Sequence, residues 1–274
     1  MDSQERTLPD YDKPPVNEVV LGVQFGTLAN FSAIHSGLFW QKIKGDYPKN
    51  SVHPQIAPSA ETFEGPVMAE LGVKTVISST PPSPRYWFLD DSENQLIQLQ
   101  SNRFLHNWRK MTGEEDYPHY SNILPEFKKQ WLVFLDFIKT EELGDINLNL
   151  WEVTYVNNLY QGEAWNDLGD LYKVFPFLSN NALPEHLKSP EKIRLTLAYA
   201  YPDKLARLYV ELATAYRRSD GTPLIQLKLT ARGQLASNDN ENLYKCLDFG
   251  RETIVKNFTD LTSLEAHKLW HRTL

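Results

Sequence analysis

The stretch RYWFLDDSENQLIQLQSNRFLHNWRK, residues Arg85–Lys110, decides the fold of this chain. Its apolar or alternating runs fall at residues 86–89, 96–100 and 104–109. Ile97 and Leu99 alternate with glutamines, which is the two-residue period of a strand that buries one face. Polar residues 90–94 separate the first two runs and suit a turn. The stretch therefore predicts an antiparallel meander of short strands.

The segments before this meander predict further strands and one helix. Residues 16–25, VNEVVLGVQF, are rich in β-branched and apolar side chains on both faces, which is typical of a central strand. Residues 28–44 have the apolar spacing of a helix. Residues 52–57 and 70–78 are predicted to form short strands between proline-containing loops.

After the meander, the chain repeats this order of elements. A helix capped by Ser121 or Asn122 carries aromatic residues at helical spacing, which indicates an amphipathic helix. The second half is predicted to contain strands at 148–159, 193–199, 206–216 and 224–232, a short helix at 164–172, and a last helix capped by Asn238 or Asn240.

The order strand, helix, strands, helix occurs once in each half, so the sequence predicts an α+β fold. We expect antiparallel sheet with helices on one face, in a TATA-binding-protein-like or helix-grip-like arrangement of two pseudo-repeated halves. The predicted organisation is an extended N-terminal arm at residues 1–15, a first half at 16–145 and a second half at 146–274, joined as one continuous two-lobed unit. Because the letters of the halves differ, a coincidence of a common α+β order stays open.

Composition narrows the class of protein. The 274 residues are 41% hydrophobic and 23% charged, which is typical of a soluble globular protein with a large core. The net charge of −7 disfavours broad nucleic-acid binding, which needs a basic surface, although a local basic patch stays possible. A single cysteine and a polar, acidic N-terminus favour a cytoplasmic protein, and no apolar run has the length of a membrane span.

No known catalytic or cofactor motif is present. The glycines form neither a phosphate-binding loop nor a dinucleotide fingerprint, so no cofactor is predicted. His267 and His271 are spaced like a pair of zinc ligands, but no third ligand accompanies them, so no metal site is predicted either. No residue is therefore assigned a catalytic role by motif.

The strand at 103–109 is the richest candidate for binding. Its alternation predicts that Phe104, His106 and Trp108 point to one face and that Arg103, Leu105, Asn107 and Arg109 point to the other. Two guanidinium groups and an amide on one face can bind a carboxylate or phosphate. Alternatively, Arg109 pairs with Glu114 or Glu115 and Asn107 satisfies a loop backbone.

Two other regions hold candidate residues. The loop at 112–120 contains Asp116 and His119, a pair that can support general base catalysis or simply form a polar loop. The strand at 224–232 directs alternate polar side chains, among them Lys228 and Arg232, to a mixed-charge face that is either a binding surface or solvated.

Several motifs resemble those of a sporadically distributed bacterial family of uncharacterised proteins of similar length. The resemblance covers nearly the whole chain. Its most specific parts are the PPVNEVVLGVQF opening, the NWR triplet Asn107–Arg109, the YVN triplet Tyr155–Asn157 and the closing FTDLT and HKLW motifs. It implies a bacterial cytoplasmic protein, and a sporadic distribution suits a mobile or phage-defence-associated gene.

Together these observations predict a non-enzymatic binding module that holds a protein partner or a small ligand on a sheet face or in a cavity between sheet and helices. The candidate binding residues are Arg103, Asn107, Arg109, Tyr117, His119, Tyr155 and Asn157. An alternative is an enzyme of unrecognised type that uses His119 and Asp116 with Arg109. A weaker alternative is nucleic-acid binding by stacking on the sheet.

Overall fold

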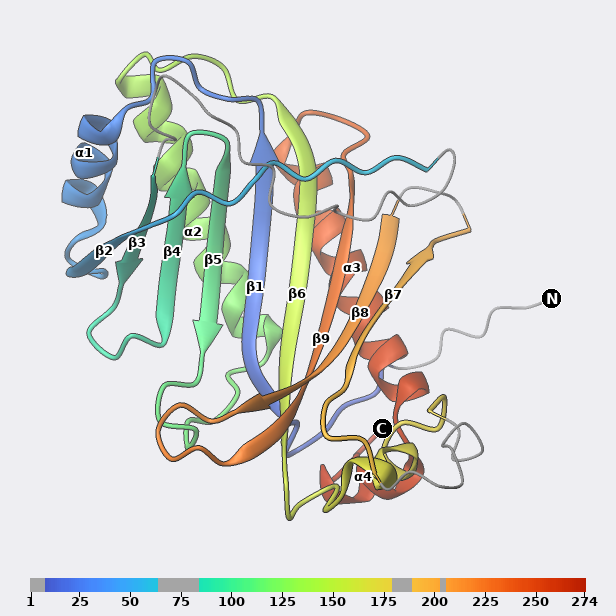
Figure 1. Cartoon of the computed structure of the whole chain (residues 1–274). Coiled ribbons are helices and arrows are strands. Elements are labelled where there is room, and N and C mark those ends of the chain that lie inside the picture. The colour runs from blue at the N-terminus through green and yellow to red at the C-terminus, as the bar shows by residue number, and fades with distance from the viewer. Residues whose placement is uncertain (1–7, 64–83, 179–188, 203–205) are drawn as a thin grey trace.

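In the part of the chain that the structure describes, one antiparallel sheet of nine strands forms the centre of the molecule (Figure 1). The structure, a computed structural model, describes residues 8–63, 84–178, 189–202 and 206–274. The strand order is β2-β3-β4-β5-β1-β6-β9-β8-β7, so β1 and β6 pair in the middle. The predicted α+β class with antiparallel sheet is confirmed, whereas the strand predicted at 70–78 lies outside the described residues.

The strands lie close to their predicted positions. Their bounds are β1 Val16–Phe25, β2 Lys49–His53, β3 Arg85–Leu89, β4 Gln95–Gln100, β5 Arg103–Arg109, β6 Leu148–Tyr160, β7 Arg194–Ala200, β8 Ala206–Tyr216 and β9 Pro223–Gln234. The predicted edge strand at 52–57 is misplaced, because β2 ends at His53. Pro54 follows it and has no backbone N–H to continue the ladder.

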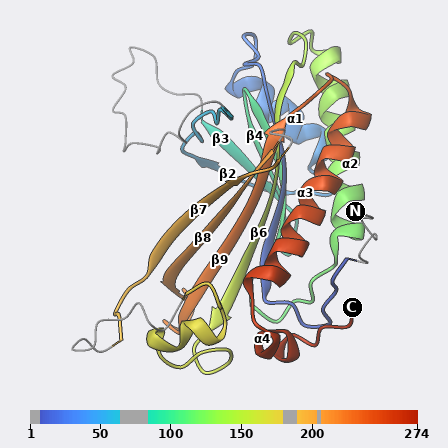
Figure 2. The same cartoon turned by 90° about the vertical axis from the view of Figure 1, so that its right-hand side faces the viewer.

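The long helices cover one face of the sheet (Figure 2). The helical elements are α1 Ala33–Ile43, α2 Tyr120–Thr140, the 3₁₀ helix η1 Leu168–Lys173, α3 Asn240–Leu261 and α4 Leu264–Leu269. Within the described part of the chain, none of these helices has both the length and the apolar character needed to cross a membrane.

Helix starts were predicted less well than strands. The first helix begins at Ala33 rather than residue 28, because the Leu28 N–H donates to the Ser101 carbonyl and keeps this segment in a loop. The helix predicted at 164–172 is the short η1, which begins where the Asp167 carboxylate accepts the Gly169 N–H.

The two long helices also start at different caps from those predicted. α2 begins at Tyr120 and not after Ser121 or Asn122, since the Asn122 amide donates to the Pro118 carbonyl and leaves the cap position to His119. α3 is capped by Asp239, whose carboxylate accepts the Asn242 N–H.

The core lies between the sheet and the long helices. Phe104 on β5 packs against Trp131 and Phe134 on α2, with ring centroids 5.5 and 5.4 Å apart, and all three are fully buried. Each such side chain contributes roughly 1.5–3 kcal/mol by leaving water. Burial alone does not distinguish the two faces of β5, because residues 103–108 are all buried; the contacts do, since Phe104 packs on α2 whereas Arg103 donates to the Ala57 carbonyl.

Residues 54–63, which we call the strap, cross the other face of the sheet (Figure 1). Near its start, the Arg103 guanidinium on β5 donates to the Ala57 carbonyl at 3.2 Å. Near its end, buried Glu61 pairs with Arg207 on β8 and accepts the Tyr209 hydroxyl at 2.8 Å. We call this side of the sheet the strap face.

The two ends of the described chain are fastened together. The Asp12 and Lys13 N–H groups donate to the carbonyls of His271 and Trp270, each at 3.1 Å. The Tyr11 hydroxyl bonds to Thr259 on α3 at 2.8 Å. Residues 8–15, the described part of the predicted arm, are therefore held against α3 and the C-terminal segment.

Candidate functional site

A cavity of about 60 Å³ lies between the sheet, α3 and residues 9–16 of the N-terminal segment. We call it the arm cavity. Its lining includes four of the candidate residues predicted from the sequence: Tyr117, His119, Tyr155 and Asn157. They come from the loop before α2 and from β6, so the fold brings together residues that the sequence separates by more than thirty positions.

Two tyrosines form the polar wall of the arm cavity. The Tyr117 and Tyr155 hydroxyl oxygens are 3.1 Å apart, within hydrogen-bond distance. Burial raises the pKa of Tyr155 to about 12, and burial also raises the pKa of Tyr117 well above its usual value. Both side chains are therefore neutral near pH 7. One hydroxyl donates to the other, so the pair keeps one O–H that can donate to a ligand.

Arg251 on α3 supplies the positive charge of the arm cavity. Its guanidinium lies 5.7 Å from the centre of the Tyr120 ring, and its charge opposes the rise in the pKa values of Tyr117, Tyr120 and Tyr155. The buried Nε of Arg251 has no hydrogen-bond partner among the described residues. None of the ion pairs between described residues includes Arg251.

Neither of two neighbouring acidic residues forms an ion pair with Arg251. Asp248, one turn earlier on α3, accepts the Tyr120 hydroxyl at 2.9 Å. Asp10, which also lines the cavity, accepts the Tyr11 N–H at 3.0 Å. A half-buried guanidinium without a carboxylate partner is costly, and an anion from solution would offset that cost.

His119 stands at the entrance with a constrained backbone. Its φ of 61° and ψ of 155° lie in a region that L-residues rarely adopt. The imidazole is exposed and its ring centre is 5.1 Å from that of Tyr117. Strain of this kind persists where surrounding contacts impose it, and here it presents the imidazole beside the cavity.

The remaining wall is apolar and comes mainly from α3. Ile254 and Phe258 are buried there, and Val16 closes the opposite side from β1. Asn157 contributes little to ligand recognition in this arrangement, because its amide donates to the Leu227 carbonyl at 3.3 Å. A cation, one free hydroxyl donor and an apolar wall suit a small organic anion with an apolar body.

The other three predicted candidates lie on the opposite side of the sheet. Arg103 holds the strap through Gln24, at 2.7 Å, as well as through the Ala57 carbonyl. Asn107 bridges neighbouring strands, since it accepts from Gln98 at 2.9 Å and donates to Glu18 at 2.6 Å. The predicted set therefore divides between two faces.

Arg109 is the most accessible of these three. Its Nε donates to the Glu93 carbonyl at 3.1 Å, and its guanidinium lies 5.3 Å from the centre of the Trp87 ring. It does not pair with Glu114 or Glu115: the Glu115 carboxylate accepts the Met111 N–H and two further backbone N–H groups instead. These bonds lower the pKa of Glu115 far below its usual range.

The enzyme alternative required Arg109, His119 and Asp116 to meet. His119 lines the arm cavity on the helix side, whereas Arg109 lies on the strap face. Asp116 is exposed and belongs to a separate groove. In the parts of the chain that the structure covers, no group of three or more His, Cys, Asp or Glu side chains is arranged to hold a metal ion.

No pattern in the sequence pointed to the structural roles of two residues, Arg251 and Glu61. Arg251 looks like an ordinary helix-surface arginine, because nothing local shows that tyrosines from distant segments surround it. Glu61 sits in a polar stretch, and its partner Arg207 is 146 positions away. Only the tertiary fold reveals either environment.

Comparisons with known proteins add little. No protein-family profile and no curated protein matches the sequence. Among solved structures, the chain is similar to one described as "Crystal structure of the di-domain ARO/CYC StfQ from the steffimycin biosynthetic pathway". The alignment spans 91% of this chain and 99% of that chain at 11% identity, with a TM-score of 0.17. A score this low supports no inference about function, which must come from the site itself.

Proposed function

We propose that this protein is a non-enzymatic binding module whose arm cavity holds a small organic carboxylate. The ligand carboxylate pairs with Arg251 and accepts from the one hydroxyl of the Tyr117–Tyr155 pair that does not donate to the other. Its apolar part lies against Ile254 and Phe258. The arrangement uses charge-assisted hydrogen bonds for orientation and apolar contact for affinity.

One observation carries this proposal: Arg251 is a cation in a tyrosine-lined cavity with no carboxylate partner among the described residues. Ordinary surface arginines keep water around the guanidinium, and buried ones are normally paired. A guanidinium that is half-buried and has no carboxylate partner favours the binding of an anion. The hydrogen-bonded pair of tyrosine hydroxyls beside it supplies one further donor for a carboxylate.

The test is a thermal-unfolding titration with benzoate as the probe. At a benzoate concentration tenfold above its dissociation constant, wild-type protein should gain about 1.4 kcal/mol of stability. For a chain of this size that corresponds to a rise of roughly 3–6 °C in Tm. Arg251→Gln should abolish the rise, because it replaces the guanidinium by a shorter, neutral amide and so removes the charge.

Two control variants make the result specific. Arg251→Lys, which retains a positive charge but loses the planar fork, should give a weaker rise than wild type. Lys256→Gln removes an exposed charge from the same helix and should respond to benzoate like wild type. Equal benzoate responses in wild type and Arg251→Gln, with both folded by circular dichroism, would refute the proposal.

The proposal extends to the organisation of the chain. In the first half, β5 pairs with β1 and β4 lies next to β5. In the second half, β9 pairs with β6 and β8 lies next to β9. The strand order is therefore compatible with two related halves. α2 and α3 close the halves in the same order. A duplication, with halves at 16–145 and 146–274, is part of our proposal. So are membership of the sporadic bacterial family and a cytoplasmic location.

A further inference from the structure

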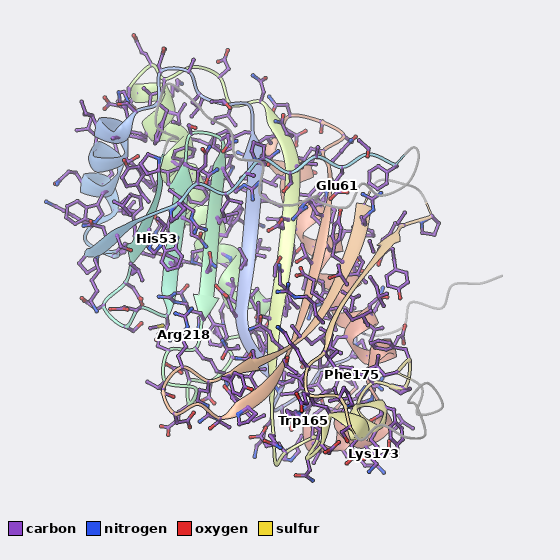
Figure 3. All side chains as sticks on the ribbon, viewed as in Figure 1. His53, Glu61, Trp165, Lys173, Phe175 and Arg218 are labelled. Atoms are coloured by element: carbon purple, nitrogen blue, oxygen red, sulfur yellow. The ribbon has the colours of Figure 1, made fainter. Side chains whose placement is uncertain are left out.

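A second cluster of basic side chains lies on the strap face, remote from the arm cavity. It is built around Trp87 on β3. Arg85 and Arg109 place their guanidinium carbons 5.4 and 5.3 Å from the centre of the indole ring. His53 on β2, labelled in Figure 3, stacks on the same ring at 3.8 Å with an angle of 25° between the planes.

These cationic groups lack carboxylate partners in the described part of the chain. Arg85 donates to the neutral Gln98 amide oxygen at 2.7 Å, and its buried Nε has no partner there. Arg109 donates to a backbone carbonyl, and no ion pair between described residues includes either guanidinium.

Two carboxylates close to Arg109, those of Glu18 and Glu93, form hydrogen bonds or ion pairs with other side chains. Glu18, the cross-strand neighbour of Arg109, accepts the Asn107 amide at 2.6 Å. Glu93 pairs with Lys49 at 2.9 Å. The positive charge of Arg109 acts on both carboxylates in the direction that lowers the pKa of each, but neither forms an ion pair with Arg85 or Arg109 among the described residues.

The positive charges of Arg85 and Arg109 affect the protonation of His53. Burial lowers the pKa of His53, and the positive charges of Arg85 and Arg109 lower it further. The Ser51 hydroxyl, 2.9 Å from His53 Nε2, is its only other close polar neighbour among the hydrogen bonds described. Like charges gathered on one indole repel each other, and an anion placed between them would relieve the repulsion.

We propose that Arg85, Arg109 and His53 form a binding site for the dianionic phosphate of a small phosphomonoester. Two guanidiniums and one imidazole match the charge and the oxygen acceptors of a phosphomonoester, which carries about −1.5 to −2 charges at pH 7. Trp87 holds the three groups in place by stacking and cation–π contact. The polymeric phosphodiester of nucleic acid fits less well, because the chain as a whole carries a net charge of −7.

The test is equilibrium dialysis with radiolabelled sulfate, a dianion of constant charge, at low ionic strength. Wild-type protein should bind sulfate saturably with one equivalent at this site. Arg85→Gln and Arg109→Gln should each weaken sulfate binding at least about tenfold, since each removes a charge-assisted pair. Absence of saturable binding by the wild type would overturn the proposal.

Arg194→Gln is the matched control. Arg194 is exposed on β7, at the far edge of the same sheet from β3. Its substitution removes an identical charge and should change sulfate affinity less than twofold. If it weakens binding as much as Arg85→Gln does, the sulfate is held only by general positive charge and the site does not exist. Circular dichroism checks that every variant is folded.

The pH dependence identifies His53. Sulfate affinity should increase as the pH falls from 8 to 5.5, because the imidazole gains its proton while sulfate keeps its charge. His53→Asn should abolish this increase and leave affinity at pH 8 within about twofold of wild type. An identical pH profile in His53→Asn would remove His53 from the site.

Two further ligands distinguish the chemical source of the phosphate. Adenosine monophosphate should bind more tightly than inorganic phosphate, and single-stranded oligothymidylate without a terminal phosphate should bind more weakly than either. Tighter binding of the oligonucleotide would overturn the phosphomonoester proposal in favour of a nucleic-acid surface. Arg251→Gln should leave all these affinities unchanged, so failure here is separable from failure of the arm-cavity proposal.

Discussion

At the scale of single residues, His106 is the most unusual buried group. Its ring is fully buried between β5 and the helices, and neither ring nitrogen has a hydrogen-bond partner among the described residues. Burial lowers the pKa of His106 to about 4. The imidazole is thus neutral and unsatisfied in the native state, which costs about 1–3 kcal/mol.

This arrangement predicts acid sensitivity. Unfolded His106 takes up a proton below its ordinary pKa of 6.5, whereas the native residue resists protonation down to about pH 4. Stability is therefore fully present above pH 6.5 and is lost as the pH falls towards 4, by about 3 kcal/mol at most.

Urea unfolding of His106→Leu tests this prediction. The variant should be at least as stable as wild type at pH 7 and should lose less stability between pH 6.5 and 4. His271→Gln, a change at an exposed histidine, should reproduce the wild-type profile. If His106→Leu and wild type lose stability in parallel, His106 is not responsible.

At the scale of elements, α3 depends on Gly250 to approach the sheet. A Cβ at this position would lie 2.6 Å from Trp151 and 2.8 Å from Val153, both buried on β6. Gly250→Ala should therefore destabilise the protein by about 1–3 kcal/mol despite the higher helix propensity of alanine. Because Arg251 follows directly, benzoate binding should weaken as well.

Gly37 in α1 provides the control for this change. No atom lies within 4 Å of a Cβ built there, and the residue is exposed. Gly37→Ala should stabilise the protein by up to about 1 kcal/mol, measured by the same denaturant unfolding. If Gly250→Ala were stabilising too, the close approach of α3 to β6 would be wrong.

The strap depends on one buried acid. Glu61 pairs with Arg207 and Arg232 and accepts the Tyr209 hydroxyl. In Figure 3, Glu61 lies towards the right of the view and His53 towards the left. Glu61→Ala leaves buried Arg207 without a carboxylate, while Arg232 keeps its pair with Glu152 at 2.7 Å, so it should destabilise the protein by about 3–5 kcal/mol in chemical unfolding.

An exposed pair gives the comparison for Glu61. Glu241 and Lys245 form an ion pair on the surface of α3, with both side chains largely in solvent. Glu241→Gln should produce no measurable change in the free energy of unfolding. A similarly small effect of Glu61→Ala would show that the strap does not depend on its buried ion pair.

At the scale of the whole molecule, local pattern predicted the strands and their faces well. Alternation in β5 and β9 placed Arg109 and Lys228 on the polar side because a strand has a fixed two-residue period. Helix starts were less accurate, since a cap such as His119 or Asp239 depends on contacts that no local pattern records.

The candidate site was predicted only in part, for a related reason. Tyr117 and Tyr155 were both named from the sequence, but their meeting depends on β6 pairing with β1 in the centre of the sheet. The element order does not determine that strand order. Arg251, which gives the arm cavity its charge, became visible only once α3 was placed over these tyrosines.

The most direct test of the central claim is a benzoate titration of protein with isotopically labelled tyrosine rings, followed by NMR. Carboxylate binding in the arm cavity should give saturable shifts at Tyr117 and Tyr155, none at the exposed Tyr199 and Tyr216, and loss of the shifts in Arg251→Gln. Unchanged Tyr117 and Tyr155 signals at high benzoate, or shifts that persist in Arg251→Gln, would contradict it.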